Sequence, residues 1–311
     1  METLSFIPLF IPLFIPPLMA IILSPLIPGV INRTKALFAG RKGQPIFQVY
    51  YDLWKLAGKG AVYSRTTSWI FRAGPITGLS SVLIALTLIP FGGVRALIAF
   101  NGDIILFAYI LGLGRVFTIL AALDTGSSFE GMGASREAQF STLAEVTLFL
   151  GLSAVVIKTG TFSISGISRA LSLDTWTGSL AVLVLAGISI LAVFLAENCR
   201  IPVDDPNTHL ELTMIHEVMV LDHGGPDLAL ILYAGTLKLW VLGALMAGII
   251  LPVLSSNYWT NILMTSAFLF ILSISVGIIE STMARLRLRR IPQLLIGASA
   301  TAVIALALAL R

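Results

Sequence analysis

Long apolar stretches alternate with short polar connections along the whole chain. A hydrocarbon core needs roughly 20 apolar residues per spanning helix, and about eight stretches meet that length. They are too long and too uniformly apolar for barrel strands, and a span must satisfy its backbone groups internally. We therefore predict an all-α, polytopic membrane protein, with residues 1–311 forming a single integral membrane domain. The predicted spans are 4–31, 69–92, 103–122, 138–157, 178–199, 227–254, 260–280 and 293–310.

The first stretch carries a regular proline pattern, FIPLFIPLFIPPL, in which Pro8, Pro12 and Pro16 are four residues apart. This spacing places the prolines on one helix face, and each proline removes a backbone donor and bends the helix. We interpret the stretch as a bent, lipid-facing anchor, with a cavity wall as the alternative. A cleaved signal peptide is not expected, because Glu2 is the only early charge and the apolar run is too long.

The composition agrees with this class. The chain is 57% hydrophobic and 12% charged, with a mean hydropathy of +0.94, whereas soluble proteins are about a quarter charged. The net charge of +4 reflects basic residues that flank the spans, so it concerns membrane orientation and not nucleic acid. The single cysteine, Cys199, cannot form an internal disulfide and indicates no redox compartment.

Basic residues are divided unequally between the two sides of the predicted bundle. Connections two, four and six carry only Arg95, Lys158 and Arg169. The positive-inside rule therefore places the odd-numbered connections in the cytoplasm and both termini outside, in a multi-pass protein of the cell's inner membrane. Counting Arg72 at the start of span two, the odd connections carry 14 of the 20 basic residues: Arg33, Lys35, Arg41, Lys42, Lys55, Lys59, Arg65, Arg72, Arg136, Arg200, Arg285, Arg287, Arg289 and Arg290.

Charged side chains inside the spans are the first candidates for function, because a charge in hydrocarbon is costly and usually functional. The functional interpretation is a proton or ion relay across part of the membrane. The alternative is a set of ion pairs that only fixes helix packing. The residues concerned are Arg115, Glu145, Glu197, Lys238 and Glu280, with Asp103 at the entrance of span three.

Residues 196–225, AENCRIPVDDPNTHLELTMIHEVMVLDHGG, hold six of the 16 carboxylates and all three histidines. Asp205 before Pro206 predicts a helix N-cap followed by proline at the first helical position. A short helix should then run to about Leu221, with His209, Thr213, His216 and Glu217 on one face. Residues 201–226 are thus expected to form a cytoplasmic acidic loop and helix at the membrane surface. The titratable residues are Glu197, Asp204, Asp205, His209, Glu211, His216, Glu217, Asp222 and His223.

The sequence predicts neither a metal site nor a catalytic centre. HEVMVLDH fails the H-E-x-x-H zinc pattern, because Val220 occupies the position of the second histidine. No glycine-rich phosphate loop, cysteine cluster or nucleophile elbow is present. We expect no cofactor in this chain. For residues 196–225, pore-lining or interface contacts and a merely solvated loop remain open.

Four motifs together resemble a known family. AENCRIPVDDP…LEL is similar to the AE-x-x-R-x-P-x-D…E-L stretch of the complex I membrane subunit that lies beside the quinone chamber. GRKGQPIFQVYYDLWKL, 40–56, resembles the first cytoplasmic loop of the same family. LDTGSSFEGMGASREAQFSTLAE, 123–145, and ESTMARLRL, 280–288, resemble the corresponding subunit of complex I-related NiFe hydrogenases such as formate hydrogenlyase.

The resemblance implies an eight-helix subunit that anchors a peripheral electron-transfer arm and begins the path from redox chemistry to ion translocation. Glu145, Glu197, Asp204 and Glu211 stand at matching positions, as do Arg136, Arg200 and Pro202. The coupling candidates are Glu145, Glu197, Asp204, Asp205, Glu211, Glu217, Lys238 and Glu280. The candidates for the subunit interface are Arg41, Lys42, Arg136, Glu137, Arg200, His209 and His216.

The partners implied are hydrogenase and iron–sulfur subunits of the arm, antiporter-like membrane subunits and the lipid bilayer, with no nucleic acid. The arm subunits would carry the NiFe centre and the iron–sulfur clusters. Three functions stay open: the coupling subunit of a respiratory hydrogenase, the quinone-chamber subunit of an NADH-quinone oxidoreductase, and a stand-alone secondary ion transporter. The DTGS…GASRE stretch favours the first. Asn207 and His209, where complex I has further glutamates, argue against transferring the quinone site, and no internal repeat supports a transporter.

Overall fold

The computed structural model describes residues 7–205, 214–253, 255 and 257–311. Regular structure in these residues is helical, without strands, so the all-α prediction is confirmed. The elements are α1 (Ile7–Leu23), α2 (Leu26–Phe38), α3 (Gln48–Ala57), α4 (Trp69–Leu88), α5 (Asp103–Asp124), α6 (Ser128–Thr159), α7 (Ile164–Ala170), α8 (Leu173–Gly178), α9 (Leu180–Glu197), η1 (Glu217–Val220), α10 (Gly225–Ile250), α11 (Tyr258–Thr282), η2 (Leu288–Arg290) and α12 (Ile291–Ala309).

Seven of the described helices are long and apolar enough to cross a membrane, and they are α4, α5, α6, α9, α10, α11 and α12. The bent pair α1–α2, with an angle of 48° between its halves, brings the number to eight if it is counted as one span. The bend follows Ser24 and Pro25, because proline has no N–H to continue the helix. Pro16 is buried, whereas Phe14 and Leu18 are 58% exposed, so this helix buries one of its prolines and exposes large apolar side chains.

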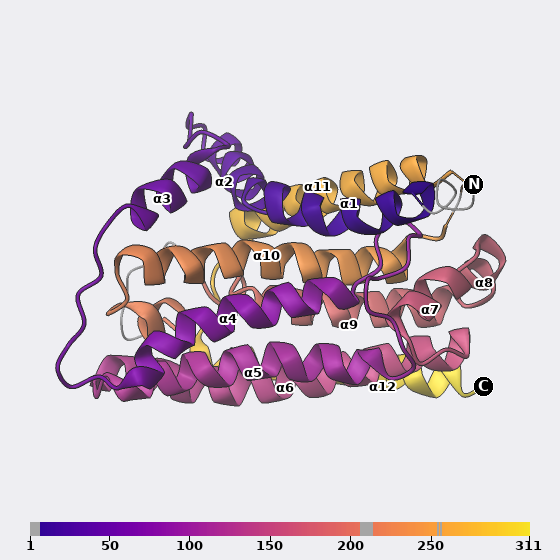
Figure 1. Ribbon diagram of the computed structural model, residues 1–311. Coiled ribbons are helices and arrows are strands. Elements are labelled where there is room, and N and C mark those ends of the chain that lie inside the picture. Colours follow the sequence, from indigo (N-terminus) through magenta and orange to yellow (C-terminus); the bar gives the residue numbers. More distant parts are fainter. Residues whose placement is uncertain (1–6, 206–213, 254, 256) are drawn as a thin grey trace.

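Helix α10 lies at the centre of the bundle, between the α1–α11 layer and the layer of α4, α5 and α6 (Figure 1). Its side chains Leu237 and Trp240 are almost fully buried. Helices α4 and α5 pack closely through small residues, since a Cβ on Gly114 would lie 2.2 Å from Ser81 Oγ. Small residues at helix contacts are typical of membrane bundles, where close backbone approach replaces the hydrophobic driving force.

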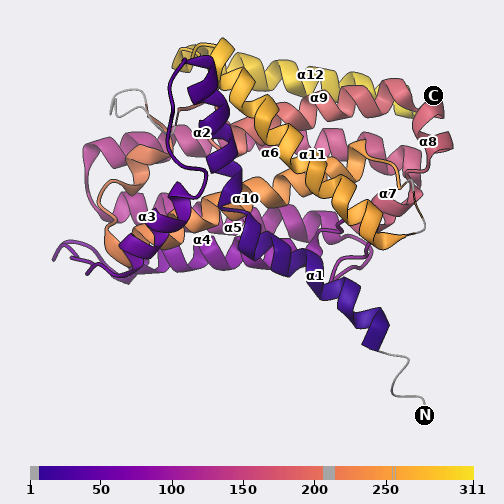
Figure 2. The same ribbon diagram turned by 90° about the horizontal axis from the view of Figure 1, so that it is seen from above.

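The two ends of the bundle are built differently. One end carries α3, η1 and the start of α6, and the other carries α7, α8 and the C-terminus (Figures 1 and 2). Helices α7 and α8 occupy the connection between α6 and α9, where no helix was predicted. Helix α6 begins at Ser128, ten residues before the predicted span.

The helix predicted up to Leu221 is wrong for its described part. Residues 214–216 form no helix, and Glu217–Val220 form a single 3-10 turn. The backbone N–H groups of Ile215 and His216 donate to Asp204 Oδ2, each at 3.2 Å, and so cannot bond within a helix. The neighbouring residues Met214, Ile215, Val218 and Met219 are buried. The rest of the predicted helix, with His209 and Glu211, lies outside the described residues.

Candidate functional site

A buried arginine on α5 holds carboxylates from two other helices. Arg115 Nη2 lies 2.7 Å from Glu197 Oε1 on α9. Its Nε lies 3.7 Å from Glu137 Oε1, and its Nη1 lies 3.9 Å from Glu145 Oε2, both on α6. The arginine side chain is only 13% exposed. A guanidinium presents several N–H donors in a fixed fork, which is why one arginine can meet several carboxylates.

Helix α10 adds a second cation to this group. Lys238 Nζ lies 2.8 Å from Glu197 Oε2, so each oxygen of Glu197 faces a different cation. The residues Arg115, Glu137, Glu145, Glu197 and Lys238 are called the central network below. It contains three carboxylates and two cations, so one added proton would balance its formal charge.

The members of the central network differ in how firmly they are held. Glu197 has a side-chain exposure of 7% and two contacts under 3 Å. Glu145 has a side-chain exposure of 33% and a single contact at 3.9 Å. Loss of charge at Glu197 would strand two buried cations, which is costly. Loss of charge at Glu145 would strand neither cation, because Arg115 and Lys238 would keep their closer contacts with Glu197.

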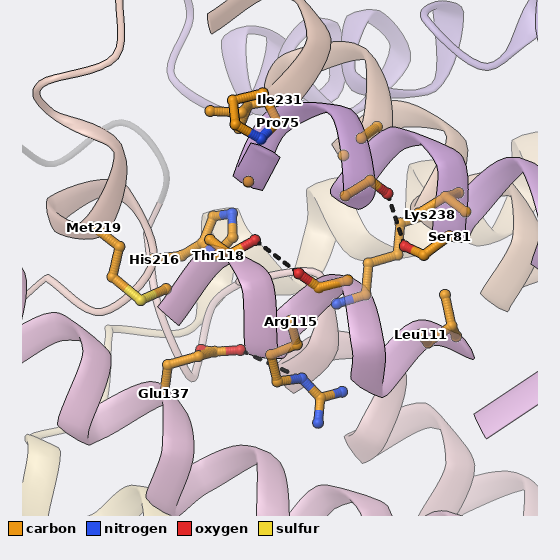
Figure 3. Close-up of a pocket in the computed structure, with 16 residues that line it drawn as sticks. Pro75, Ser81, Leu111, Arg115, Thr118, Glu137, His216, Met219, Ile231 and Lys238 are labelled. Atoms are coloured by element: carbon orange, nitrogen blue, oxygen red, sulfur yellow. Dashed lines mark hydrogen bonds and ion pairs between the residues drawn. The ribbon is translucent and has the colours of Figure 1, made fainter. Parts of the chain in front are cut away.

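The central network borders two cavities. The first has a volume of about 90 Å³ and is lined by Arg115, Glu137, His216 and Lys238 (Figure 3). Glycines of α4 also line it. The second has a volume of about 280 Å³ and is lined by α2, α3, α9 and α10 side chains that include Glu197 and Lys238. Both have room for water, which occupies roughly 30 Å³ per molecule in the liquid. A proton could therefore reach Glu137 and Glu197, which line these cavities, by way of hydrogen-bonded water.

His216 lines both cavities. Burial lowers the pKa of its imidazole below the ordinary value, and the nearby Glu137 opposes this shift. The imidazole is therefore neutral at pH 7, and a neutral imidazole can accept a proton on one nitrogen and donate from the other. Cys199 lines the second cavity, and burial raises the pKa of its thiol well above the ordinary value. It is an uncharged wall residue.

A second group of ion pairs joins α2, α11 and the segment after α9. Glu280 on α11 lies 2.9 Å from Lys35 Nζ and 3.5 Å from Arg200 Nη1. Asp204 lies 2.6 Å from Arg285 Nη2, and it also accepts the two N–H groups described above. The residues Lys35, Arg200, Asp204, Glu280 and Arg285 are called the clamp below. It contains three cations and two carboxylates, the reverse of the central network.

The predicted coupling residues thus fall into separate places. Glu145, Glu197 and Lys238 meet in the central network, whereas Asp204 and Glu280 belong to the clamp. Glu217 lines the second cavity, and Asp205 donates its N–H to Asp204 Oδ1. Glu211 lies outside the described residues. Arg115 was noted as a charge within an apolar span but was not among the predicted coupling or interface residues, although that signal was usable.

The predicted interface residues are equally divided. Arg41 and Lys42 are exposed between α2 and α3. Glu137 belongs to the central network, and Arg200 is 7% exposed within the clamp. Arg136 is half-buried and donates to the carbonyl of Met214 at 2.7 Å. His209 lies outside the described residues. Within the part of the chain that the structure describes, no three His, Cys, Asp or Glu residues are placed to hold a metal ion.

Comparison with known proteins identifies similar chains that align over most of this one. Residues 11–310 match the model of the family described as NADH dehydrogenase. Formate hydrogenlyase subunit 4 of Escherichia coli (strain K12) is 28% identical, over 89% of this chain and 91% of its own. Hydrogenase-4 component C of the same strain is 30% identical, over 85% of this chain and 84% of its own.

Two further similarities are looser. An NADH-quinone oxidoreductase subunit of Rubrobacter xylanophilus is 28% identical, but over only 48% of this chain and 45% of its own. A chain from the structure of the membrane-bound sulfane sulfur reductase, an archaeal respiratory membrane complex, superposes with a TM-score of 0.82. That chain is 21% identical and covers 97% of this one, so it supports the fold alone.

Proposed function

We propose a coupling role for this chain, which belongs to the NADH dehydrogenase family. It is the membrane-anchoring and ion-coupling subunit of a multisubunit respiratory hydrogenase complex, and it links electron transfer in a peripheral arm to ion translocation. The observation that carries this proposal is the central network, in which three carboxylates share two cations beside two cavities. An anchoring role alone would not need an unbalanced buried charge.

The similarities favour a hydrogenase over a quinone reductase. The two hydrogenase-type relatives align over more than four fifths of both chains, whereas the NADH-quinone oxidoreductase subunit aligns over less than half. Family membership also argues against a stand-alone transporter. The partners are then arm subunits that carry a NiFe centre and iron–sulfur clusters, together with antiporter-like membrane subunits.

In this proposal the whole chain acts as one membrane domain, and residues 201–226 face the arm. Reduction of a cluster in the arm adds negative charge near this segment. Charge interactions are strong where water is excluded, so the added charge changes proton affinity in the central network. Glu145 takes up a proton and releases it again, and His216 carries protons between the two cavities.

The orientation follows from the basic residues. We place the connections 32–68 and 281–292 in the cytoplasm of an inner-membrane protein, with both termini outside. A single cysteine introduced at Lys59 or Arg287 should react with a membrane-impermeant label only from the cytoplasmic face. Labelling from the outer face of intact cells would contradict the eight-span orientation.

The coupling role is tested by Glu145→Gln, which keeps the size of the side chain but cannot titrate. We expect normal subunit content and normal hydrogen activity with an artificial electron acceptor, and a large loss of ion uptake in sealed vesicles. Asp174→Asn, an exposed carboxylate on α8, is the matched control and should leave uptake unchanged. Normal uptake in Glu145→Gln would remove this residue from the path.

A further inference from the structure

A third cavity lies at the other end of the bundle, remote from the central network and the clamp. It has a volume of about 390 Å³ and is formed by the α4–α5 connection and the α6–α7 connection. Helix α7 marks this end in Figure 1. By the orientation proposed above, the cavity opens at the outer surface of the membrane.

The cavity is positively charged. Arg95 and Arg169 line it, and the described residues that line it include no acid. The nearest carboxylate, Asp103, is fully buried, and its two oxygens already accept from Ser163 Oγ and from the N–H of Ile164, both at 2.7 Å. Only three basic residues occur in connections two, four and six, and two of them meet here.

The donors around the cavity suit a phosphate group. Arg95 uses one N–H on the carbonyl of Ala99, at 2.7 Å, and a guanidinium has five such donors. Arg169 is exposed. Arginine holds phosphate bidentately, with charge-assisted hydrogen bonds that are stronger than neutral ones. Thr161 and Ser163 also line the wall, but their hydroxyl groups donate to Thr159 and Asp103, so the charged donors for the phosphate are the two arginines.

An apolar surface continues from the cavity along α5. Phe100 and Phe162 line the cavity and are 45% and 42% exposed. Ile105, Tyr109 and Leu113 follow at intervals of four residues and are 43%, 63% and 54% exposed, so they form one outer stripe of the helix. A free phosphate ion would not need such a stripe, whereas a lipid acyl chain would.

We propose that this cavity binds an anionic phospholipid, with its phosphate on Arg95 and Arg169 and one acyl chain along the Ile105–Tyr109–Leu113 stripe. Aromatic side chains at the membrane–water interface support this placement, because their rings lie at the level of the headgroups. The site is distinct from the coupling function, since it lies at the opposite end of α5 from the α5–α6 connection.

The test uses the purified complex in detergent, titrated with phosphatidylglycerol and followed by native mass spectrometry. Arg95→Gln/Arg169→Gln should bind the lipid about 30-fold more weakly, since a basic residue contributes roughly 1 kcal/mol to an anionic lipid. Lys158→Gln, a basic residue of the same side that does not line the cavity, is the control and should bind normally. Equal binding by all three forms would overturn the proposal.

Two further measurements separate a lipid from a free anion. Phosphatidylcholine, whose headgroup has no net charge, should not replace phosphatidylglycerol, and inorganic phosphate should not displace it at matched concentration. Displacement by inorganic phosphate would show a simple anion site and would overturn the lipid assignment. Arg95→Lys/Arg169→Lys keeps both charges, and we expect it to retain most of the binding if the glutamine variant fails to assemble.

Discussion

The central network and the clamp are made of the same groups in opposite proportion. In the central network carboxylates outnumber cations, and in the clamp cations outnumber carboxylates. Glu280 in the clamp has a side-chain exposure of 0% and a cation near each oxygen, whereas Glu145 has one distant cation and is one-third exposed. A buried glutamate is therefore not by itself a relay residue. The balance of charge around it decides whether a proton can be added without stranding a cation.

The largest effect should come from Glu197→Gln, because this change leaves both Arg115 and Lys238 without their closest carboxylate. Removing one partner of a buried pair costs about 3–5 kcal/mol. We expect little assembled complex, measured as subunit content and melting temperature after purification. Glu197→Gln/Lys238→Met removes one stranded cation and should recover part of the stability. Full assembly of the single variant would show that the central network contributes little to folding.

A smaller loss of stability is expected for Glu280→Gln in the clamp. The cost should be about 2–3 kcal/mol, because Lys35 has a side-chain exposure of 24% and can turn to water. The complex that does assemble should retain full vesicle ion uptake, unlike Glu145→Gln. Reduced uptake per assembled complex would contradict the division of roles and would place the clamp on the ion path.

The smallest effect should be the pH dependence of stability, which concerns two histidines between α9 and α10. Burial lowers the pKa values of both His216 and His223. The unfolded state then binds more protons, so stability falls as pH decreases through the unfolded value of about 6.5. We expect the melting temperature to drop between pH 7.5 and pH 5.5. His216→Gln/His223→Gln should flatten the dependence of melting temperature on pH. An unchanged dependence would show that these histidines do not cause it.

Much of the fold could be predicted from the sequence, because each span is an uninterrupted apolar run and the bilayer fixes its length. The bend at Ser24–Pro25, the short helices α7 and α8, and the irregular path of residues 214–216 could not, since they depend on contacts between distant segments. Asp204 shows this directly: the sequence indicates a titratable acid, but the structure uses it to hold two backbone N–H groups and Arg285.

The site was predictable in its residue types and not in its grouping. Glu145, Glu197, Lys238 and Glu280 were recognisable as costly charges in apolar spans. Their separation into two networks depends on which helix faces meet. The pattern of apolar and polar positions does not predict which faces these are. Arg115, which joins three of the carboxylates, carried the same signal as Lys238.

Helix α6 has a mechanical consequence. Its 32 residues extend over about 48 Å at roughly 1.5 Å per residue, which exceeds a hydrocarbon core of about 30 Å, so an upright α6 would extend beyond the bilayer. Arg136 and Glu145 lie on this helix about 13 Å apart. Because both residues belong to one continuous helix, a displacement of its N-terminal end along the helix axis would also move Glu145. Arg115 is 3.7 Å and 3.9 Å from the two α6 carboxylates but 2.7 Å from Glu197. A small shift of α6 along its axis would therefore change which carboxylates Arg115 contacts most closely.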